Sequence, residues 1–180
     1  CGFPLCKGNI MASNPQWCLT LDEWKEQFSQ WIRMPHPDAL LNATIFFDFR
    51  PLFGKAELAD TMRRHLLTQT TANPMFLRCM AKNALDVEPP LGKIRDFLTD
   101  LEPDQPGKID LKKYGSRIFV DVARIYALAA GVHNTNSVQR LRLAAKRLSI
   151  RDEEINAVLE GLDFIQLLRL RHQYLEGEPG

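Results

Sequence analysis

Apolar residues recur along this chain at the three- and four-residue intervals of a helix rather than at alternate positions, as in a strand. The first such row contains Leu21, Trp24, Phe28 and Trp31. Thr20 and Glu23 form a capping box, so we expect a helix from residue 20 to about residue 33. We expect its aromatic side to pack as core or against a neighbouring domain.

The same pattern predicts further helices, and their ends carry recognisable signals. Gly54 precedes one helix, Asn73 and Pro74 supply a cap and a first-turn proline for another, and Gly131 ends a third. The expected ranges are 55–70, 74–86, 116–130, 137–148 and 150–175. We therefore predict a mostly α protein, a helical bundle of five to six helices.

Two segments depart from the helical pattern. Residues 43–50 are rich in aromatic and β-branched residues and are followed by Pro51 and Gly54, which favours a short strand or extended segment. Residues 87–111 are interrupted by prolines and glycines. In that long loop a small ribbon near 91–111 is expected, with 91–98 pairing to 108–111.

Charged residues within the apolar run suggest a first candidate site. Asp48 and Arg50 are two residues apart, so an extended backbone would place both on one face. One interpretation is an ion pair that closes a strand edge. The other is a site where a carboxylate and a guanidinium meet phosphate or metal.

Two further pairs of charged residues lie on predicted helices. Asp121 and Arg124 are three apart and therefore neighbours on the helix surface. They form either a solvated ion pair or a pair with at least one charge in a groove. Arg169 and Arg171 lie near the end of the last helix. They either form a cationic rim for phosphates or complement the helix dipole.

Composition narrows the classes of function. The 180 residues are 45% hydrophobic and 25% charged, with a formal charge of +1, which suits a folded domain with a real core. The near-neutral charge argues against a nucleic-acid partner. No apolar run approaches the ~18 residues of a membrane helix. We expect no membrane association and a cytoplasmic location.

Cysteine and histidine spacing argues against a metal site. The four cysteines, Cys1, Cys6, Cys18 and Cys79, contain no Cys-x-x-Cys pair, which makes zinc binding an unfavoured interpretation. The four histidines also lack the spacing of metal ligands. We expect reduced thiols and no metal bound by this chain.

Several motifs distributed along the chain carry a family resemblance. They are Gly2-Phe3-Pro4-Leu5-Cys6, Asn9–Pro15, Trp24, Trp31-Ile32, Phe46–Arg50, Pro89–Gly92, Ile109–Lys112, Phe119–Leu128, Asn134-Thr135 and Leu168–Gln173. Together they resemble the C-terminal half of a family of bacterial signal-transduction nucleotidyltransferases, whose members carry cyclic-nucleotide-binding and CBS domains upstream. The stretch around Phe47–Arg50 is also similar to PII-protein uridylyltransferase.

The resemblance implies a division of the molecule into parts. The family's catalytic signature is a Gly-Ser pair followed by Asp-x-Asp carboxylates that hold magnesium. This chain has no Asp-x-Asp, and its only Gly-Ser is Gly115-Ser116. The resemblance therefore implies that residues 1–19 are an irregular arm that ends the preceding catalytic domain and that 20–180 form the helical substrate-binding domain.

The resemblance also implies ligands and partners. The full-length protein would use Mg²⁺ and a nucleoside triphosphate, while this fragment alone would be inactive and hold no cofactor. Its partners would be a nucleotide, an unknown acceptor that could be a protein, and its own catalytic domain. The candidate substrate-binding residues are Asp48, Arg50, Asp121, Arg124, Arg169 and Arg171. The alternative is a non-catalytic helical module for homodimerisation or regulation.

Overall fold

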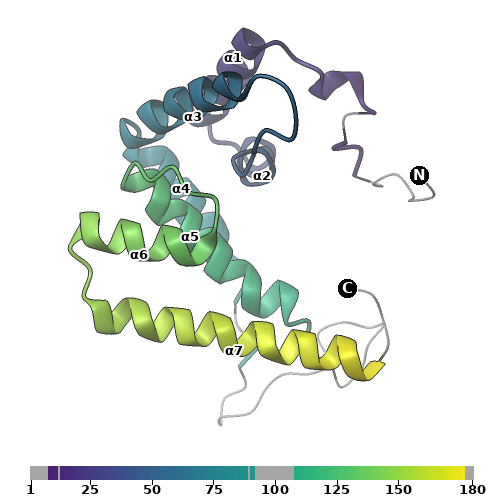
Figure 1. The fold of residues 1–180 in the computed structure, drawn as a ribbon, viewed down its shortest axis with the longest axis vertical. Coiled ribbons are helices and arrows are strands. Elements are labelled where there is room, and N and C mark those ends of the chain that lie inside the picture. The colour runs from purple at the N-terminus through teal and green to yellow at the C-terminus, as the bar shows by residue number, and fades with distance from the viewer. Residues whose placement is uncertain (1–7, 12, 89, 92–107, 177–180) are drawn as a thin grey trace. The chain divides into compact units, whose positions relative to one another are not determined.

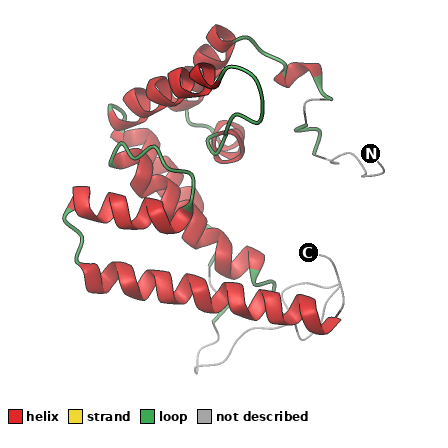
Figure 2. Cartoon of the chain, viewed as in Figure 1, coloured by secondary structure: helices red, strands yellow, loops and turns green. Residues whose placement is uncertain are grey.

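The computed structural model describes residues 8–11, 13–88, 90–91 and 108–176. Figure 1 traces the chain, and Figure 2 shows that its regular structure is helical in these ranges. The chain divides into two compact units, Cys1–Gln69 and Thr70–Gly180. The mostly α prediction is confirmed, whereas the expected boundary after residue 19 stays a prediction.

The first unit contains a short 3-10 helix η1 (Pro15–Trp17), then α1 (Leu21–Arg33), α2 (Pro37–Phe46) and most of α3 (Ala56–Thr71). The predicted capping box is present at α1. The Thr20 side chain accepts from Glu23 N, and Glu23 Oε2 accepts from Thr20 N at 2.7 Å. These hydrogen bonds from Thr20 lower the pKa of the exposed Glu23 carboxyl.

Aromatic rings form the core of the first unit. Phe28 lies between Trp31, at 5.3 Å between ring centroids, and Phe47, at 5.2 Å. All three side chains are at most 5% exposed. Trp24 and Phe46 extend the cluster, at 5.1 Å from each other. The aromatic row predicted on this helix therefore packs as core, which is one of the two arrangements expected for it.

The expected strand near residues 43–50 is wrong. Residues up to Phe46 are the end of α2, and Phe47 is its C-cap in helical conformation. Pro37 in the first turn and the His36 cap start this helix. Tertiary burial of Ala39, Leu40 and Ala43 outweighs the strand preference of the aromatic and β-branched residues.

The second unit contains α4 (Pro74–Leu85), a five-residue π-helix η2 (Lys112–Ser116), α5 (Arg117–Ala129), α6 (Ser137–Leu148) and α7 (Asp152–Glu176). Helix α5 packs against α4 and α6, and α7 contacts both α6 and η2. Asn73 and Asn136 cap α4 and α6 through their side chains. Gly131, with a φ of +65°, follows α5 as expected.

Small side chains bring the helices of the second unit close together. Ala123 of α5 and Ala145 of α6 share a buried cluster with Leu141, Ile155 and Leu159. Ala127 and Ala144 form a second cluster with Val132. Between helices, an alanine row allows closer backbone approach than leucine would, so α5 and α6 can pack closely.

The expected ribbon near 91–111 lies mostly outside the described residues. Of its second strand, Lys108–Asp110 have no regular structure and Leu111 begins the turn into η2. Asp110 Oδ1 accepts hydrogen bonds from the backbone amides of Lys112 and Lys113, at 2.8 and 3.0 Å. In the described ranges no helix is long and apolar enough to span a membrane.

Candidate functional site

A buried ion pair lies at the centre of α5. Arg124 Nη1 donates to Asp121 Oδ1 at 2.7 Å, and the two side chains are 7% and 10% exposed. Arg117, one turn earlier on the same helix, places its Nε 3.6 Å from Asp121 Oδ2. The solvated interpretation of the Asp121–Arg124 pair is therefore wrong. The helix directs both charges inward, where each offsets the desolvation of the other.

A third arginine joins the last helix, α7, to η2. Arg169 of α7 donates from Nη1 to Ser116 Oγ and to Gln166 Oε1, each at 3.3 Å. Arg169 is half-buried. Within the part of the chain that the structure describes, no carboxylate pairs with it. A guanidinium so placed can still bind an anion, because two neutral partners leave most of its donors unused.

Glycine makes the approach of η2 to α7 possible. A Cβ on Gly115 would lie 3.2 Å from Ile165 Cδ1 and 3.2 Å from Ile165 Cγ2. A larger residue at position 115 would require the Ile165 side chain to shift, so Gly115 permits the close contact between η2 and α7. The Gly115-Ser116 pair thus has a packing role that the sequence did not indicate.

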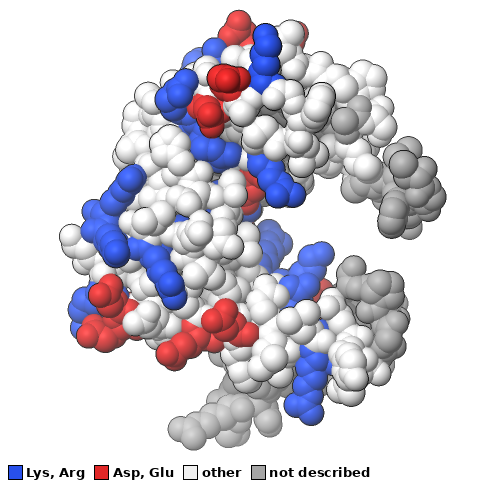
Figure 3. Space-filling model, in the orientation of Figure 1, with Lys and Arg blue, Asp and Glu red and all other residues white. Residues whose placement is uncertain are grey.

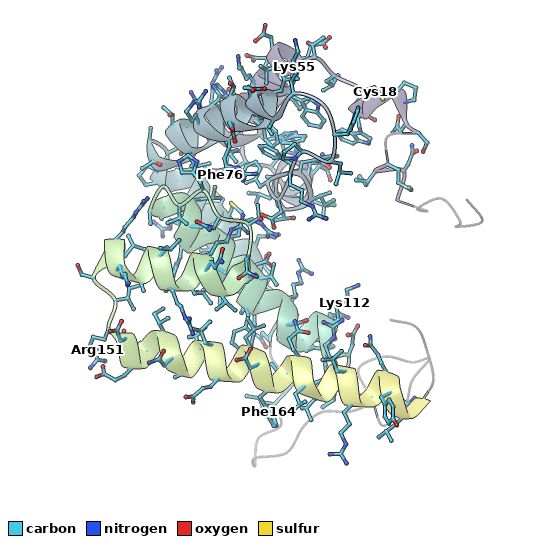
Figure 4. All side chains as sticks on the ribbon, viewed as in Figure 1. Cys18, Lys55, Phe76, Lys112, Arg151 and Phe164 are labelled. Atoms are coloured by element: carbon cyan, nitrogen blue, oxygen red, sulfur yellow. The ribbon has the colours of Figure 1, made fainter. Side chains whose placement is uncertain are left out.

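Positive charge gathers where η2 meets α7. Lys112 and Lys113 precede Ser116 by one helical turn, and Arg117 follows it. The Lys113 ammonium lies 4.8 Å from the centroid of the Tyr114 ring. In Figure 3, Lys and Arg side chains lie over this part of the second unit, and Figure 4 labels Lys112 there. Asp110, which accepts from the Lys112 and Lys113 amides, and Asp121 offset only part of this charge, so the local balance is cationic.

Arg171 does not share this location. It is exposed and lies two residues after Arg169 on α7, which turns it about 200° around the helix. The cationic rim predicted from Arg169 and Arg171 together is therefore split between two sides of α7. Only Arg169 reaches η2.

Asp48 and Arg50 belong to the first unit and do not lie on a strand. Asp48 is half-buried in the turn that follows α2, and Arg50 is exposed. Between them, Phe49 is held by Arg63 of α3, whose Nη2 donates to the Phe49 carbonyl. The Arg63 guanidinium also lies over the Phe49 ring, 4.5 Å from its centroid. The segment is therefore fixed by an arginine that sequence analysis did not select.

The first unit also contains an apolar cavity of about 330 Å³. Its walls come from α1, α2 and α3 and from the segments beside them: Leu19, Leu21, Trp24, Phe28, Phe46, Phe49, Leu58, Ala59 and Met62. Among the described residues that line it, the Trp24 indole is the one hydrogen-bonding side chain, and none is charged. Such a cavity can accept an apolar group, but it has few polar atoms to orient a nucleotide.

Sequence reasoning missed Ser116, Arg117, Gln166 and Arg63. Arg117 was detectable, because Arg117, Asp121 and Arg124 follow one another at the i, i+4, i+7 spacing of one helix face. Ser116, Gln166 and Arg63 carried no signal in the sequence, since their roles depend on contacts between elements distant in the chain. Among the described residues, no three His, Cys, Asp or Glu side chains gather as a metal site.

Comparison with protein families gave two matches. Residues 74–179, more than half of the chain, match the family described as "Putative nucleotidyltransferase substrate binding domain". Residues 1–38 match the family described as "Putative nucleotidyltransferase DUF294". Comparison with curated proteins and with solved structures gave no match. The first match covers the unit that contains the α5 ion pair and Arg169.

Proposed function

Because the chain belongs to the family of nucleotidyltransferase substrate-binding domains, we propose that its second unit holds the phosphates of a nucleotide at Arg169. The observation that carries this proposal is the half-buried guanidinium of Arg169, bonded in the described structure only to the neutral Ser116 and Gln166. A phosphate would supply the negative charge that these partners lack, through two parallel N–H···O bonds.

Neighbouring groups support a phosphate at this position. Lys112, Lys113 and Arg117 add positive charge beside Ser116, and the Ser116 hydroxyl can donate to a phosphate oxygen. The Asp121–Arg124 pair contributes indirectly, because Asp121 also attracts Arg117 from one helical turn away. The ion pair with Asp121 therefore orients the Arg117 side chain before a ligand arrives.

The rest of the reaction belongs to the same proposal. In nucleotidyl transfer an acceptor attacks the α-phosphorus of a nucleoside triphosphate and pyrophosphate leaves. Mg²⁺ supplies charge neutralisation in such reactions when it is bound by carboxylates. We assign those carboxylates to a catalytic domain with the Asp-x-Asp signature, which this sequence lacks. This chain would position the nucleotide and the acceptor, in a signal-transduction protein regulated by upstream cyclic-nucleotide-binding and CBS domains.

Calorimetric titration tests the phosphate site. The 180-residue chain is titrated with inorganic pyrophosphate and with each Mg²⁺–nucleoside triphosphate. We expect binding that weakens as salt rises and that weakens at least tenfold in Arg169→Gln, since one charged, bidentate contact is worth about 1.5–3 kcal/mol. Arg142→Gln is the matched control, because Arg142 is exposed on α6 and should leave affinity unchanged.

Two results would contradict the proposal. Absence of heat with pyrophosphate and with all four nucleotides would mean that the cationic surface binds no phosphate. Equal affinities for Arg169→Gln and the unchanged chain would mean that phosphate binds elsewhere.

For the first unit, Asp48→Asn and Arg50→Gln in a polypeptide that includes the catalytic domain should slow transfer. Unchanged transfer would show that these two residues take no part in the reaction.

A second candidate function is a helical interaction module. It is favoured by a different observation, the large apolar side chains that α7 exposes: Phe164, Leu167, Leu170, Tyr174 and Leu175.

A further inference from the structure

Helix α7 carries a row of exposed side chains on the side opposite its core contacts. Ile155, Leu159 and Leu162 are buried, at 5–6% exposure. Phe164, at 61%, and Leu167, at 63%, lie on the other side of the helix. In Figure 1, α5 and α6 lie on one side of α7. Large apolar side chains exposed one turn apart, as Phe164 and Leu167 are, are typical of an interaction surface.

The row has the spacing of a helix-pairing seam. Intervals of four and three residues alternate through Glu153, Ala157, Glu160, Phe164, Leu167, Arg171 and Tyr174, and every member is exposed. This is the a/d spacing by which two helices pack side by side. We call these seven residues the α7 seam. They lie on a helix of 25 residues, so the seam is long enough for a partner helix.

The charges of the α7 seam select its partner. The amino-terminal half carries Glu153 and Glu160, the middle carries Phe164 and Leu167, and the carboxy-terminal half carries Arg171. We propose that the seam binds the seam of a second copy of this chain, with the two α7 helices antiparallel. Glu160 of each copy then faces Arg171 of the other, so the interface contains two equivalent ion pairs related by a two-fold axis.

The same alignment also matches side-chain size. When Glu160 faces Arg171, Phe164 of one copy lies beside Leu167 of the other, at the centre of the interface. Ala157, one of the smallest side chains, then faces Tyr174, one of the largest, which is 87% exposed in the single chain. A small residue opposite a large one lets two helices interdigitate without a void.

A parallel arrangement is disfavoured by the same residues. It would place Glu160 beside Glu160 and Arg171 beside Arg171, and like charges at an interface suppress the wrong pairing. The apolar part of the seam is short, so we expect the interface to bury a surface area at the small end of the range for specific interfaces. We expect a reversible dimer with a dissociation constant in the micromolar range. This proposal does not depend on nucleotide binding.

Sedimentation equilibrium of the full 180-residue chain tests the dimer. The average mass is expected to rise from 20.6 kDa towards twice that value as protein concentration passes through the micromolar range. Glu160→Arg and Arg171→Glu should each raise the dissociation constant at least tenfold, because each places like charges opposite one another. Arg142→Glu, a charge reversal on the exposed side of α6, is the matched control and should dimerise like the unchanged chain.

Exchange of the charges gives the sharper result. The double variant Glu160→Arg with Arg171→Glu should dimerise again, because the two ion pairs re-form with reversed signs. A mixture of the two single variants should form a mixed dimer, since one chain then presents only arginine and the other only glutamate at these positions. Far-UV circular dichroism confirms that each variant is folded.

Three outcomes would overturn the proposal. The first is a chain that stays at 20.6 kDa throughout the concentration range. The second is a dimer that neither single reversal weakens, which would place the interface elsewhere. The third is single reversals that weaken the dimer without rescue by the double variant or by mixing, which would exclude the antiparallel alignment.

Discussion

The two units are stabilised in different ways. The first unit buries large rings, Phe28, Trp31 and Phe47 among them, and leaves an apolar cavity of about 330 Å³ beside them. The second unit buries alanines, and it also buries Asp121, Arg124 and Arg140. Large rings supply a large apolar area. Small side chains bring helix backbones close together, and the charges buried there must pair in a defined geometry.

That difference explains why the candidate site lies in the second unit. A site that recognises phosphate needs cations held in fixed positions. Asp121 pairs with Arg117 and Arg124 along α5, and Gly115 packs against Ile165 of α7. In the first unit, Arg63 instead packs over the Phe49 ring. All three tryptophans, Trp17, Trp24 and Trp31, lie in the first unit. Tryptophan fluorescence therefore reports on the first unit alone.

The largest expected effect is loss of a ring from the first unit. Phe47 is 1% exposed, and Phe47→Ala should lower the free energy of unfolding by about 3–5 kcal/mol, through lost burial and a new cavity. Urea unfolding followed by tryptophan fluorescence measures it. Phe53→Ala is the control, because Phe53 is fully exposed and should change the midpoint little. Equal midpoints for the two variants would show that the ring cluster does not stabilise this unit.

Breaking the buried ion pair should affect the second unit by a similar or slightly smaller amount. Arg124→Met leaves Asp121 with only the longer contact to Arg117, and we expect a loss of about 3 kcal/mol. The change should appear in far-UV circular dichroism of the helices but not in tryptophan fluorescence. Removing both charges, with Asp121→Leu and Arg124→Met, should restore much of the stability. A double variant less stable than the single one would contradict this account.

Removing one helix cap in each unit should have smaller effects. Thr20→Ala and Asn136→Ala each remove a side chain that accepts a backbone hydrogen bond at a helix start, which costs about 1 kcal/mol. We expect Thr20→Ala to shift the fluorescence transition and Asn136→Ala to shift only the circular dichroism transition. Two variants that shift both signals equally would show that the units unfold together.

The Thr20 cap should also depend on pH. Hydrogen bonds from Thr20 lower the folded pKa of Glu23, so this carboxylate stabilises the fold above its unfolded pKa of about 4.3. That contribution is lost as pH falls through the lowered folded pKa. Glu23→Gln should therefore flatten the acid limb of the fluorescence-detected stability curve. An unchanged limb would mean that the capping box does not form in solution.

The smallest effect is expected at Gly161, in the middle of α7. Alanine there gains about 1 kcal/mol of helix propensity, but its Cβ would lie 3.2 Å from Phe119 Cζ. The two effects should nearly cancel, leaving a change within about 0.5 kcal/mol. Gly131→Ala provides the contrast, since its φ of +65° strains any L residue and should destabilise the second unit. Thermal unfolding by circular dichroism compares the two.

The sequence by itself determined most of the helices. Local signals, such as the Thr20–Glu23 capping box and the Asn73-Pro74 start of α4, depend only on nearby residues, and the structure confirms them. The prediction of a strand near residues 43–50 was wrong because the local preference for an extended backbone is weak. Burial of Ala39 and Ala43 stabilises helix α2 instead.

Only the tertiary structure decided which polar groups meet. Asp121 and Arg124 were recognisable as neighbours on a helix, but their burial depends on which face of α5 the other helices cover. The contact between Ser116 and Arg169 joins residues 53 positions apart. Helical periodicity states how residues are arranged around one axis, whereas contacts between helices depend on side-chain volumes and crossing angles that no local pattern records.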